Sequence, residues 1–329
     1  MTDRIEPADR TDLTGSATTD VPPGLDSSPT SATSPASTSA SATTSVSASS
    51  ASVSPSPSSS PSPSPFDLAG LHVEEAGDGG PVLLCLHGIG SSSAAFAPQL
   101  ATLSRYVWVV AWDAPGYAKS ADPVGPFTLD DFADTAAALI RQRGGRAHVL
   151  GVSWGGVIAL RLAARHPELV SSLIVAASSA GSGTDPAKAE AMRARADELA
   201  EVGPRAFAER RGPRLVSDAA PEALVQRVTD TMADSLRLPG YRYSTESMAA
   251  TDLRIADLSA VTAPALVLCG DQDRVTGIEA SQMLTADLHS SVFVIVKDAG
   301  HLANQEQSEA FDAWVLAHLR ISAGIAESC

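Results

Sequence analysis

Cysteine is scarce in this chain of 329 residues, and its placement excludes two classes of protein. The three cysteines, Cys85, Cys269 and Cys329, are odd in number and far apart, which argues against a disulfide scaffold or a C-x-x-C metal site. Cys85 and Cys269 stand inside apolar runs, where a reduced thiol packs as a small hydrophobic group. We therefore expect a cytoplasmic protein with no metal site.

Concentrated positive charge and long apolar runs are also missing. Acidic residues outnumber basic ones by 38 to 23, the formal net charge is −15, and no dense block of Lys and Arg occurs. A nucleic-acid-binding face needs such a block, so we expect no nucleic-acid partner. No apolar run is long enough to span a bilayer, and the first residues, MTDRIEPADRTDLTG, lack the apolar core of a secretory signal. The composition leaves the oligomeric state open.

Residues 1–65 consist largely of Ser, Thr, Ala and Pro. Such a segment has too little apolar surface to offset the entropy lost on ordering, so it predicts a disordered tail with polyproline II character at the Ser-Pro repeats. Two interpretations stay open. The tail is either a phosphorylated or tethering linker, or a dispensable extension that includes a start codon assigned too early.

From Phe66 onward, apolar runs alternate with segments of helical periodicity. A short β-hairpin is predicted over 66–80. Continuous apolar runs are typical of strands buried on both faces, and they occur at 81–88, 106–113, 147–153, 171–179, 264–273 and 291–301. Helical spacing of apolar residues occurs at 93–104, 129–144, 154–168, 281–289 and 309–319.

This alternation predicts an α/β fold with a mostly parallel, twisted sheet and helices on both faces. It is interrupted at 184–250, which reads as helical without a buried strand. We expect this insertion to form a cap over the carboxyl ends of the strands, where ligands bind in open α/β sheets. The predicted core then consists of 66–183 and 251–329.

The segment GVSWGG places Ser153 between a predicted strand and a predicted helix. This is the setting of a G-x-S-x-G nucleophile elbow, in which flanking glycines leave room for a tight turn around the serine. Gly151 and Gly155 would supply that room, and the helix N-terminus would supply free N–H groups and positive potential. The alternative is a turn that happens to contain serine.

A serine nucleophile needs a base and an orienting acid, which follow it along the chain in this architecture. The segment LVLCGDQD offers Asp271 and Asp273 just past a strand, and His301 follows the next strand. We expect the other histidines to serve packing or the surface; they are His72, His87, His148, His166, His289 and His318. The oxyanion hole would use the N–H groups of Trp154 and of Ile89 in the glycine-rich loop HGIGSS, whose alternative is a simple turn.

Four segments in this order, HGIGSS, DAPGYAKS, GVSWGG and the pair GDQD with AGH, resemble the α/β-hydrolase superfamily from Phe66 to the end of the chain. The resemblance implies the α/β-hydrolase fold and places the acid at the last residue of G-x-x-D, which selects Asp273. DAPGYAKS departs from the family's D-x-P-G-x-G-x-S at Ala118, which we expect to alter loop conformation and not chemistry. Asp113 is expected to be a turn residue.

The resemblance implies acyl transfer without a cofactor: His301, oriented by Asp273, would deprotonate Ser153, which would attack a carbonyl. DAPGYAKS, PGYRYSTESMAATDLR and VTAPALVLCGDQDRVT are similar to the 3-oxoadipate enol-lactonase branch. The expected partner is therefore a small ester or lactone. The alternatives are a C–C hydrolase of vinylogous diketones, a cofactor-free perhydrolase or haloperoxidase, and a non-catalytic ligand-binding protein.

The predicted cap is rich in arginine, and one of these side chains could bind a substrate carboxylate bidentately. The candidates are Arg193, Arg195, Arg205, Arg210, Arg211 and Arg214. The alternative is that they are solvated helix residues paired within the helix with Glu190, Glu198, Glu201 and Glu209. The sequence does not choose between them.

Overall fold

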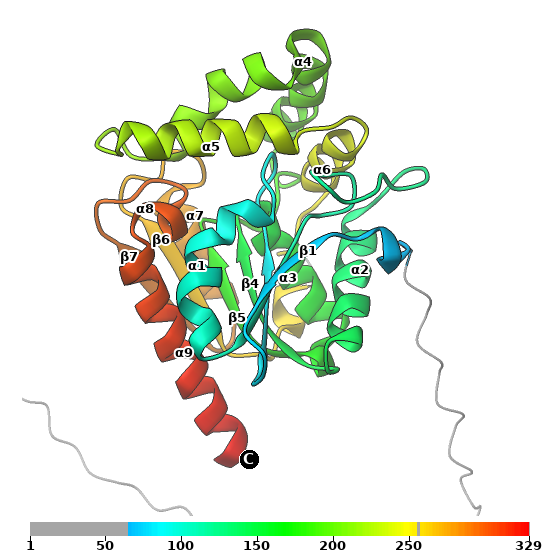
Figure 1. Ribbon diagram of the computed structural model, residues 1–329. Helices are drawn as coiled ribbons and strands as arrows, with labels where there is room; N and C mark the ends of the chain where they lie inside the picture. The colour runs from blue at the N-terminus through cyan, green and yellow to red at the C-terminus, as the bar shows by residue number, and fades with distance from the viewer. Residues whose placement is uncertain (1–64, 255–256, 329) are drawn as a thin grey trace, which may run out of the picture. The chain divides into compact units, whose positions relative to one another are not determined.

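The apolar runs form a seven-stranded sheet in the computed structural model, which describes residues 65–254 and 257–328 (Figure 1). The strands are β1 Val73–Ala76, β2 Val82–Leu86, β3 Trp108–Trp112, β4 Ala147–Val152, β5 Val170–Ala176, β6 Ala265–Gly270 and β7 Ser291–Val296. Their order is β1-β3-β2-β4-β5-β6-β7, and every neighbouring pair except β1–β3 is parallel. The predicted mostly parallel sheet is thus confirmed. The predictions for the tail and for Cys329 lie outside the described residues.

The predicted hairpin over 66–80 is wrong. Leu68–Gly70 forms a 3-10 helix, η1, and β1 is a single strand that pairs antiparallel with β3. The reason is that β2, which follows β1, has both edges occupied by β3 and β4. The strand β1 therefore cannot pair with β2 and adds at the edge of β3.

Helices cover both faces of the sheet, and others form the insertion between β5 and β6. They are α1 Ala97–Thr102, α2 Leu129–Gln142, α3 Trp154–Arg165, α4 Pro186–Arg211, α5 Glu222–Ser235, α6 Gly240–Ala249, α7 Gly277–Asp287, α8 Ala303–Glu306 and α9 Ser308–Ser328. Short 3-10 segments lie at η2 Ser93–Phe96, η3 Leu103–Arg105, η4 Pro167–Leu169, η5 Gly212–Leu215 and η6 Leu258–Ala260. Among the described residues, no helix combines the length and apolar character needed to cross a membrane.

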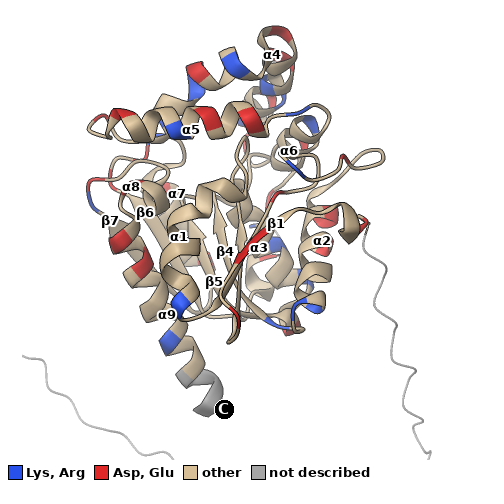
Figure 2. Ribbon diagram, viewed as in Figure 1, with Lys and Arg blue, Asp and Glu red and all other residues tan. Residues whose placement is uncertain are grey.

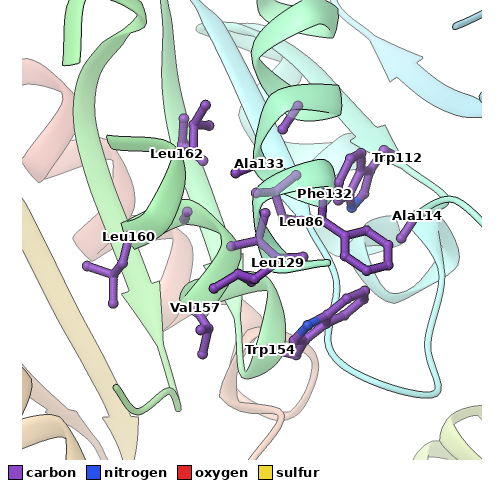
Figure 3. Packing of buried hydrophobic residues seen from close by; sticks show 14 of the residues in the cluster. Leu86, Trp112, Ala114, Leu129, Phe132, Ala133, Trp154, Val157, Leu160 and Leu162 are labelled. Atoms are coloured by element: carbon purple, nitrogen blue, oxygen red, sulfur yellow. The ribbon is translucent and has the colours of Figure 1, made fainter. Parts of the chain in front are cut away.

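Alternate residues of the inner strands enter two different apolar clusters, which explains why their sequences are continuously apolar. In β2, Leu84 and Leu86 pack with α2 and α3, whereas Leu83 and Cys85 pack with α1 and α9. Figure 3 shows the first cluster, in which Leu86 lies near the rings of Phe132 and Trp112. Cys85 and Cys269 are both free and buried, as predicted.

The insertion between β5 and β6 consists of α4, α5 and α6, which lie together on one side of the sheet in Figure 1. We call these three helices the cap. The helix α4 is kinked at Gly203, which has a φ of 76°. The next residue, Pro204, has no N–H and cannot donate the helical hydrogen bond.

The cap approaches the core closely where Gly240 of α6 meets Gly116. A Cβ atom added to Gly240 would lie 2.2 Å from the Gly116 carbonyl oxygen. Beside this contact, the hydroxyl of Tyr117 bonds to Ser244 Oγ, and Trp154 Nε1 donates to Ser247 Oγ at 3.0 Å. The N-terminal end of α6 therefore rests directly on the backbone of the DAPGYAKS loop.

This contact predicts that Gly240→Ala destabilises the protein. Two backbones would have to separate, and overpacking of this kind costs about 1–3 kcal/mol. Urea denaturation should show a lower midpoint for Gly240→Ala, while Gly79→Ala, where an added Cβ meets nothing within 4 Å, should stay within about 0.5 kcal/mol of the wild type. Equal midpoints for all three proteins would contradict the close contact.

Candidate active site

Ser153 stands at the turn that joins β4 to α3, with φ 56° and ψ −118°. These angles are unusual for a residue with a side chain, and such strain persists only where surrounding structure enforces it. Here the Ser153 N–H donates to the Ala176 carbonyl at 2.8 Å, and its own carbonyl accepts a hydrogen bond from Ser178 Oγ at 2.7 Å. The turn therefore holds a half-buried hydroxyl at the end of a parallel strand.

The glycines around Ser153 are required by close backbone contacts. A Cβ on Gly155 would lie 1.9 Å from the Leu86 carbonyl oxygen, and a Cβ on Gly151 would lie 2.2 Å from the Gly155 carbonyl oxygen. Neither distance is attainable for real atoms. The segment is thus a strand–turn–helix elbow pressed against the end of β2, and not an ordinary turn that contains serine.

Asp273 follows β6 and His301 follows β7, and the tertiary fold joins them. His301 Nδ1 lies 3.1 Å from Oδ1 and 3.0 Å from Oδ2 of Asp273, and both side chains are buried. The other candidate, Asp271, instead accepts a hydrogen bond from the Ala299 N–H at 3.3 Å and lies 3.6 Å from Lys297 Nζ. Of the two carboxylates, only Asp273 contacts His301.

Asp273 is held ionised by its surroundings. Burial alone would raise its pKa, but the hydrogen bond and charge of His301 outweigh burial, with help from Thr276 Oγ1 and the Val275 N–H. The pKa of this carboxyl therefore lies well below its usual range. An ionised carboxylate can only accept a hydrogen bond, so Nδ1 of a neutral His301 must carry the proton that is donated to Asp273. The other ring nitrogen, Nε2, is then an acceptor.

Ser153 and His301 line one cavity of about 380 Å³, whose walls come from both the core and the cap. Its lining includes three residues that follow different strands, namely Gly88, Ser153 and Val275. The cap contributes residues such as Met192 and Met248. Ile89 and Trp154 also line it. Trp154 is the first residue of α3, so its N–H has no acceptor within the helix.

The side chain of Trp154 has a separate role. Its ring is buried, packs edge-on against Phe132 at a centroid distance of 4.7 Å, and bonds to α6 through Nε1 (Figure 3). The side chain thus ties the elbow to α2 and to the cap.

Two buried groups position the glycine-rich loop, and sequence reasoning assigned neither a role in the site. His87 Nδ1 donates to the Gly88 carbonyl at 2.9 Å, and His87 Nε2 accepts from the Ala114 N–H at 2.9 Å. Burial lowers the pKa of His87, which favours the neutral ring that this pattern requires. The ring of Tyr117 packs edge-on against the ring of His87 at a centroid distance of 5.3 Å. No motif marks these contacts, because they join separate loops.

The loop DAPGYAKS keeps the conformation that glycine favours despite its alanine. Ala118 has φ 41°, and its N–H donates to the Ser235 carbonyl at the end of α5 at 3.0 Å. Asp113 is a turn residue, as predicted, because its carboxylate accepts from the backbone N–H groups of Ser93 and Lys119. Ala118 therefore holds a left-handed backbone conformation that is strained for a residue with a side chain.

Glu306 links the cap to the loop that carries His301, and nothing in the sequence pointed to it. Its carboxylate accepts from the N–H of Ser217 at 3.1 Å and from the N–H of Gly300 at 2.8 Å. The Leu302 N–H donates to the Leu215 carbonyl at 3.0 Å. Both chain neighbours of His301 are thus tied to the segment between α4 and α5.

Four of the six candidate arginines are paired, two across helices and two within α4. Arg193 bonds to Glu246 of α6, and Arg205 bonds to Asp230 of α5. Of the four glutamates predicted as partners, only Glu198 forms ion pairs, and it does so with both Arg210 and Arg211. No described residue forms an ion pair or side-chain hydrogen bond with Arg195 or Arg214. Within the described residues, no group of three or more His, Cys, Asp or Glu is arranged to hold a metal.

Comparison with known proteins agrees with this architecture. The chain is 30% identical over 238 residues to 3-oxoadipate enol-lactonase 2 of Acinetobacter baylyi, covering 70% of this chain and 86% of that protein. Among solved structures, the enol-lactonase from Burkholderia xenovorans LB400 has a TM-score of 0.70 at 26% identity, covering 76% of this chain and 96% of that one. A malate-bound thermophilic esterase from Thermogutta terrifontis also has a TM-score of 0.70, at 27% identity, covering 77% of this chain and 93% of that one. The sequence model of the alpha/beta hydrolase family matches residues 83–314, and the chain belongs to this family.

Proposed function

We propose that this protein is a serine hydrolase that cleaves a small carboxylic ester or lactone. Ser153 is the nucleophile, His301 the base and Asp273 the residue that orients it, with the Ile89 and Trp154 N–H groups as the oxyanion hole. One observation carries the proposal: a strained turn presents Ser153 to the same cavity that holds a histidine bonded to an ionised carboxylate. The related enol-lactonases and esterase support this choice of bond.

The chemistry proceeds in two halves. His301 Nε2 takes the proton of the Ser153 hydroxyl as Oγ attacks the carbonyl carbon, and the N–H groups of Ile89 and Trp154 stabilise the oxyanion. Collapse of the tetrahedral intermediate breaks the C–O bond, and His301 gives its proton to the leaving oxygen. Water, deprotonated by His301, then attacks the acyl carbon and releases Ser153.

The environment of Asp273 suits this series of reaction steps. His301 becomes positively charged each time it takes a proton, and a carboxylate that stays ionised lowers the free energy of that cation. In a lactone, the leaving oxygen remains attached to the acyl group, so a single hydroxy acid is released. The proposed steps use only groups of this chain and water.

Ser153→Ala should lower kcat/KM on 4-nitrophenyl butyrate by at least about 10³-fold, because the covalent route is lost. Ser171→Ala, a half-buried serine on β5, is the matched control and should stay within about twofold. A fluorophosphonate should label the wild type and the control but not Ser153→Ala. If the wild type hydrolyses no ester or enol-lactone in a panel, or Ser153→Ala remains active, the proposal fails. Cleavage of a vinylogous diketone or peroxide-dependent halogenation instead would assign the site to another reaction.

Asp273→Asn should lower kcat by about 10³–10⁴-fold, since the amide can donate to Nδ1 and so permits the wrong histidine tautomer. Asp271→Asn, on the neighbouring carboxylate, is the control and should cost little activity. Equal losses in the two variants would assign the effect to the loop and not to the contact with His301.

The same variant should show a pH-dependent stability difference. The folded pKa of Asp273 lies below its usual value, so its contribution to the free energy of unfolding is complete above the usual carboxyl range and decreases as the pH falls toward the folded value. The melting temperatures of wild type and Asp273→Asn should therefore differ most above about pH 5 and converge in stronger acid. A difference that grows with acidification would contradict the lowered pKa.

A further inference from the structure

A second cavity, of about 470 Å³, adjoins the first beneath the cap. The two cavities share part of their walls, namely Ile89, Gly90, Arg195, Leu215, Met232 and Val275. These residues therefore face both cavities. Arg195, on α4, is the only charged residue among the described ones that lines both.

The charged residues that line the second cavity are mostly basic. They are Arg195, Arg211, Arg214, Arg274 and a single carboxylate, Asp218. Asp218 forms an ion pair with Arg274, in which Oδ2 and Nη2 are 2.6 Å apart, and Arg211 forms an ion pair with Glu198. Figure 2 shows basic and acidic residues intermingled along α4 and α5, and Arg205 of α4 pairs with Asp230 of α5. Positive charge without a partner is therefore left at Arg195 and at Arg214, whose side chain is more exposed.

Arg195 differs from the other charged residues that line the first cavity. Lys188, Arg254 and Asp287 are exposed, and Arg254 is already bonded to Asp252 at 3.0 Å. Arg195 is half-buried beside Tyr241, and burial lowers the pKa of its guanidinium. An arginine nevertheless stays protonated in proteins, and a partly buried cation without a partner is unfavourable. A bound anion would remove that cost.

We propose that Arg195 and the second cavity form a carboxylate subsite, which makes Arg195 the residue that determines substrate specificity. The preferred substrate is then an ester or lactone with a free carboxylate at the end remote from the scissile bond. A guanidinium suits this role because its planar donors match the two oxygens of a carboxylate. The proposal rests on the proposed hydrolase function for its chemistry, and it adds the charge of the substrate.

The test compares two esters of similar length, 4-nitrophenyl hydrogen glutarate, which ends in a carboxylate, and 4-nitrophenyl pentanoate, which is neutral. The measured quantity is the ratio of kcat/KM for the charged ester to that for the neutral one. Arg195→Gln should lower this ratio by about 10- to 100-fold, mainly through KM, as expected for loss of a charge-assisted hydrogen bond. Arg195→Lys should retain part of the ratio. Arg205→Gln, a cap arginine that lines neither cavity, should leave the ratio unchanged.

A second measurement uses inhibition. Glutarate should inhibit hydrolysis of the neutral ester by the wild type and by Arg205→Gln, and at least about tenfold more glutarate should be needed for Arg195→Gln. The proposal is overturned if Arg195→Gln changes kcat/KM for both esters equally, or if the wild type does not distinguish them. Failure of the hydrolase function is separate, because the wild type would then cleave neither ester and resist the fluorophosphonate.

Discussion

The contact between Gly155 and the backbone at the end of β2 constrains everything around the site. A side chain at that position would lie within 1.9 Å of the Leu86 carbonyl oxygen, so α3 can begin where it does only because the residue is glycine. The approach of α3 to β2 forces a sharp reversal between β4 and α3, and Ser153 takes up the strain at φ 56°. The loop after Leu86 is brought beside the same serine, where a Cβ on Gly88 would lie 3.1 Å from Ser153 Cβ. A single steric requirement thus sets the serine, the start of the helix and the glycine-rich loop together.

The cap depends on this arrangement and in turn affects it. Trp154 links the elbow to α6 through its indole N–H, and Tyr117 contacts both the glycine-rich loop and α6. On the other side, Glu306 joins the segment after α4 to the backbone beside His301. The loop that carries His301 and the segment between α4 and α5 are therefore linked by hydrogen bonds, so a movement of one would disturb the other. The cavity of the proposed reaction is the space that these links leave open.

The sequence predicted the apolar strands, the strand–turn–helix at Ser153 and the insertion, because each depends on local periodicity and on glycine at tight turns. It failed at 66–80, where it predicted a hairpin. Pairing of that strand depended on which sheet edge was free, and β2 had none. The choice of Asp273 came from a resemblance in sequence, and the structure brings that carboxylate to His301 while Asp271 turns to Ala299. The roles assigned to these residues stay predictions.

The sequence by itself determined the fold class, the elbow and the order of serine, acid and histidine along the chain, since these depend on residue type and spacing over short distances. The tertiary structure alone decided which cap arginines lack a partner. Six arginines look alike along the cap sequence. Arg193 and Arg205 have partners on other helices, whereas Arg210 and Arg211 share Glu198 within α4. Ion pairing between helices depends on their packing, which no local pattern encodes. Arg195 was therefore distinguished only once α4 was placed over the cavity.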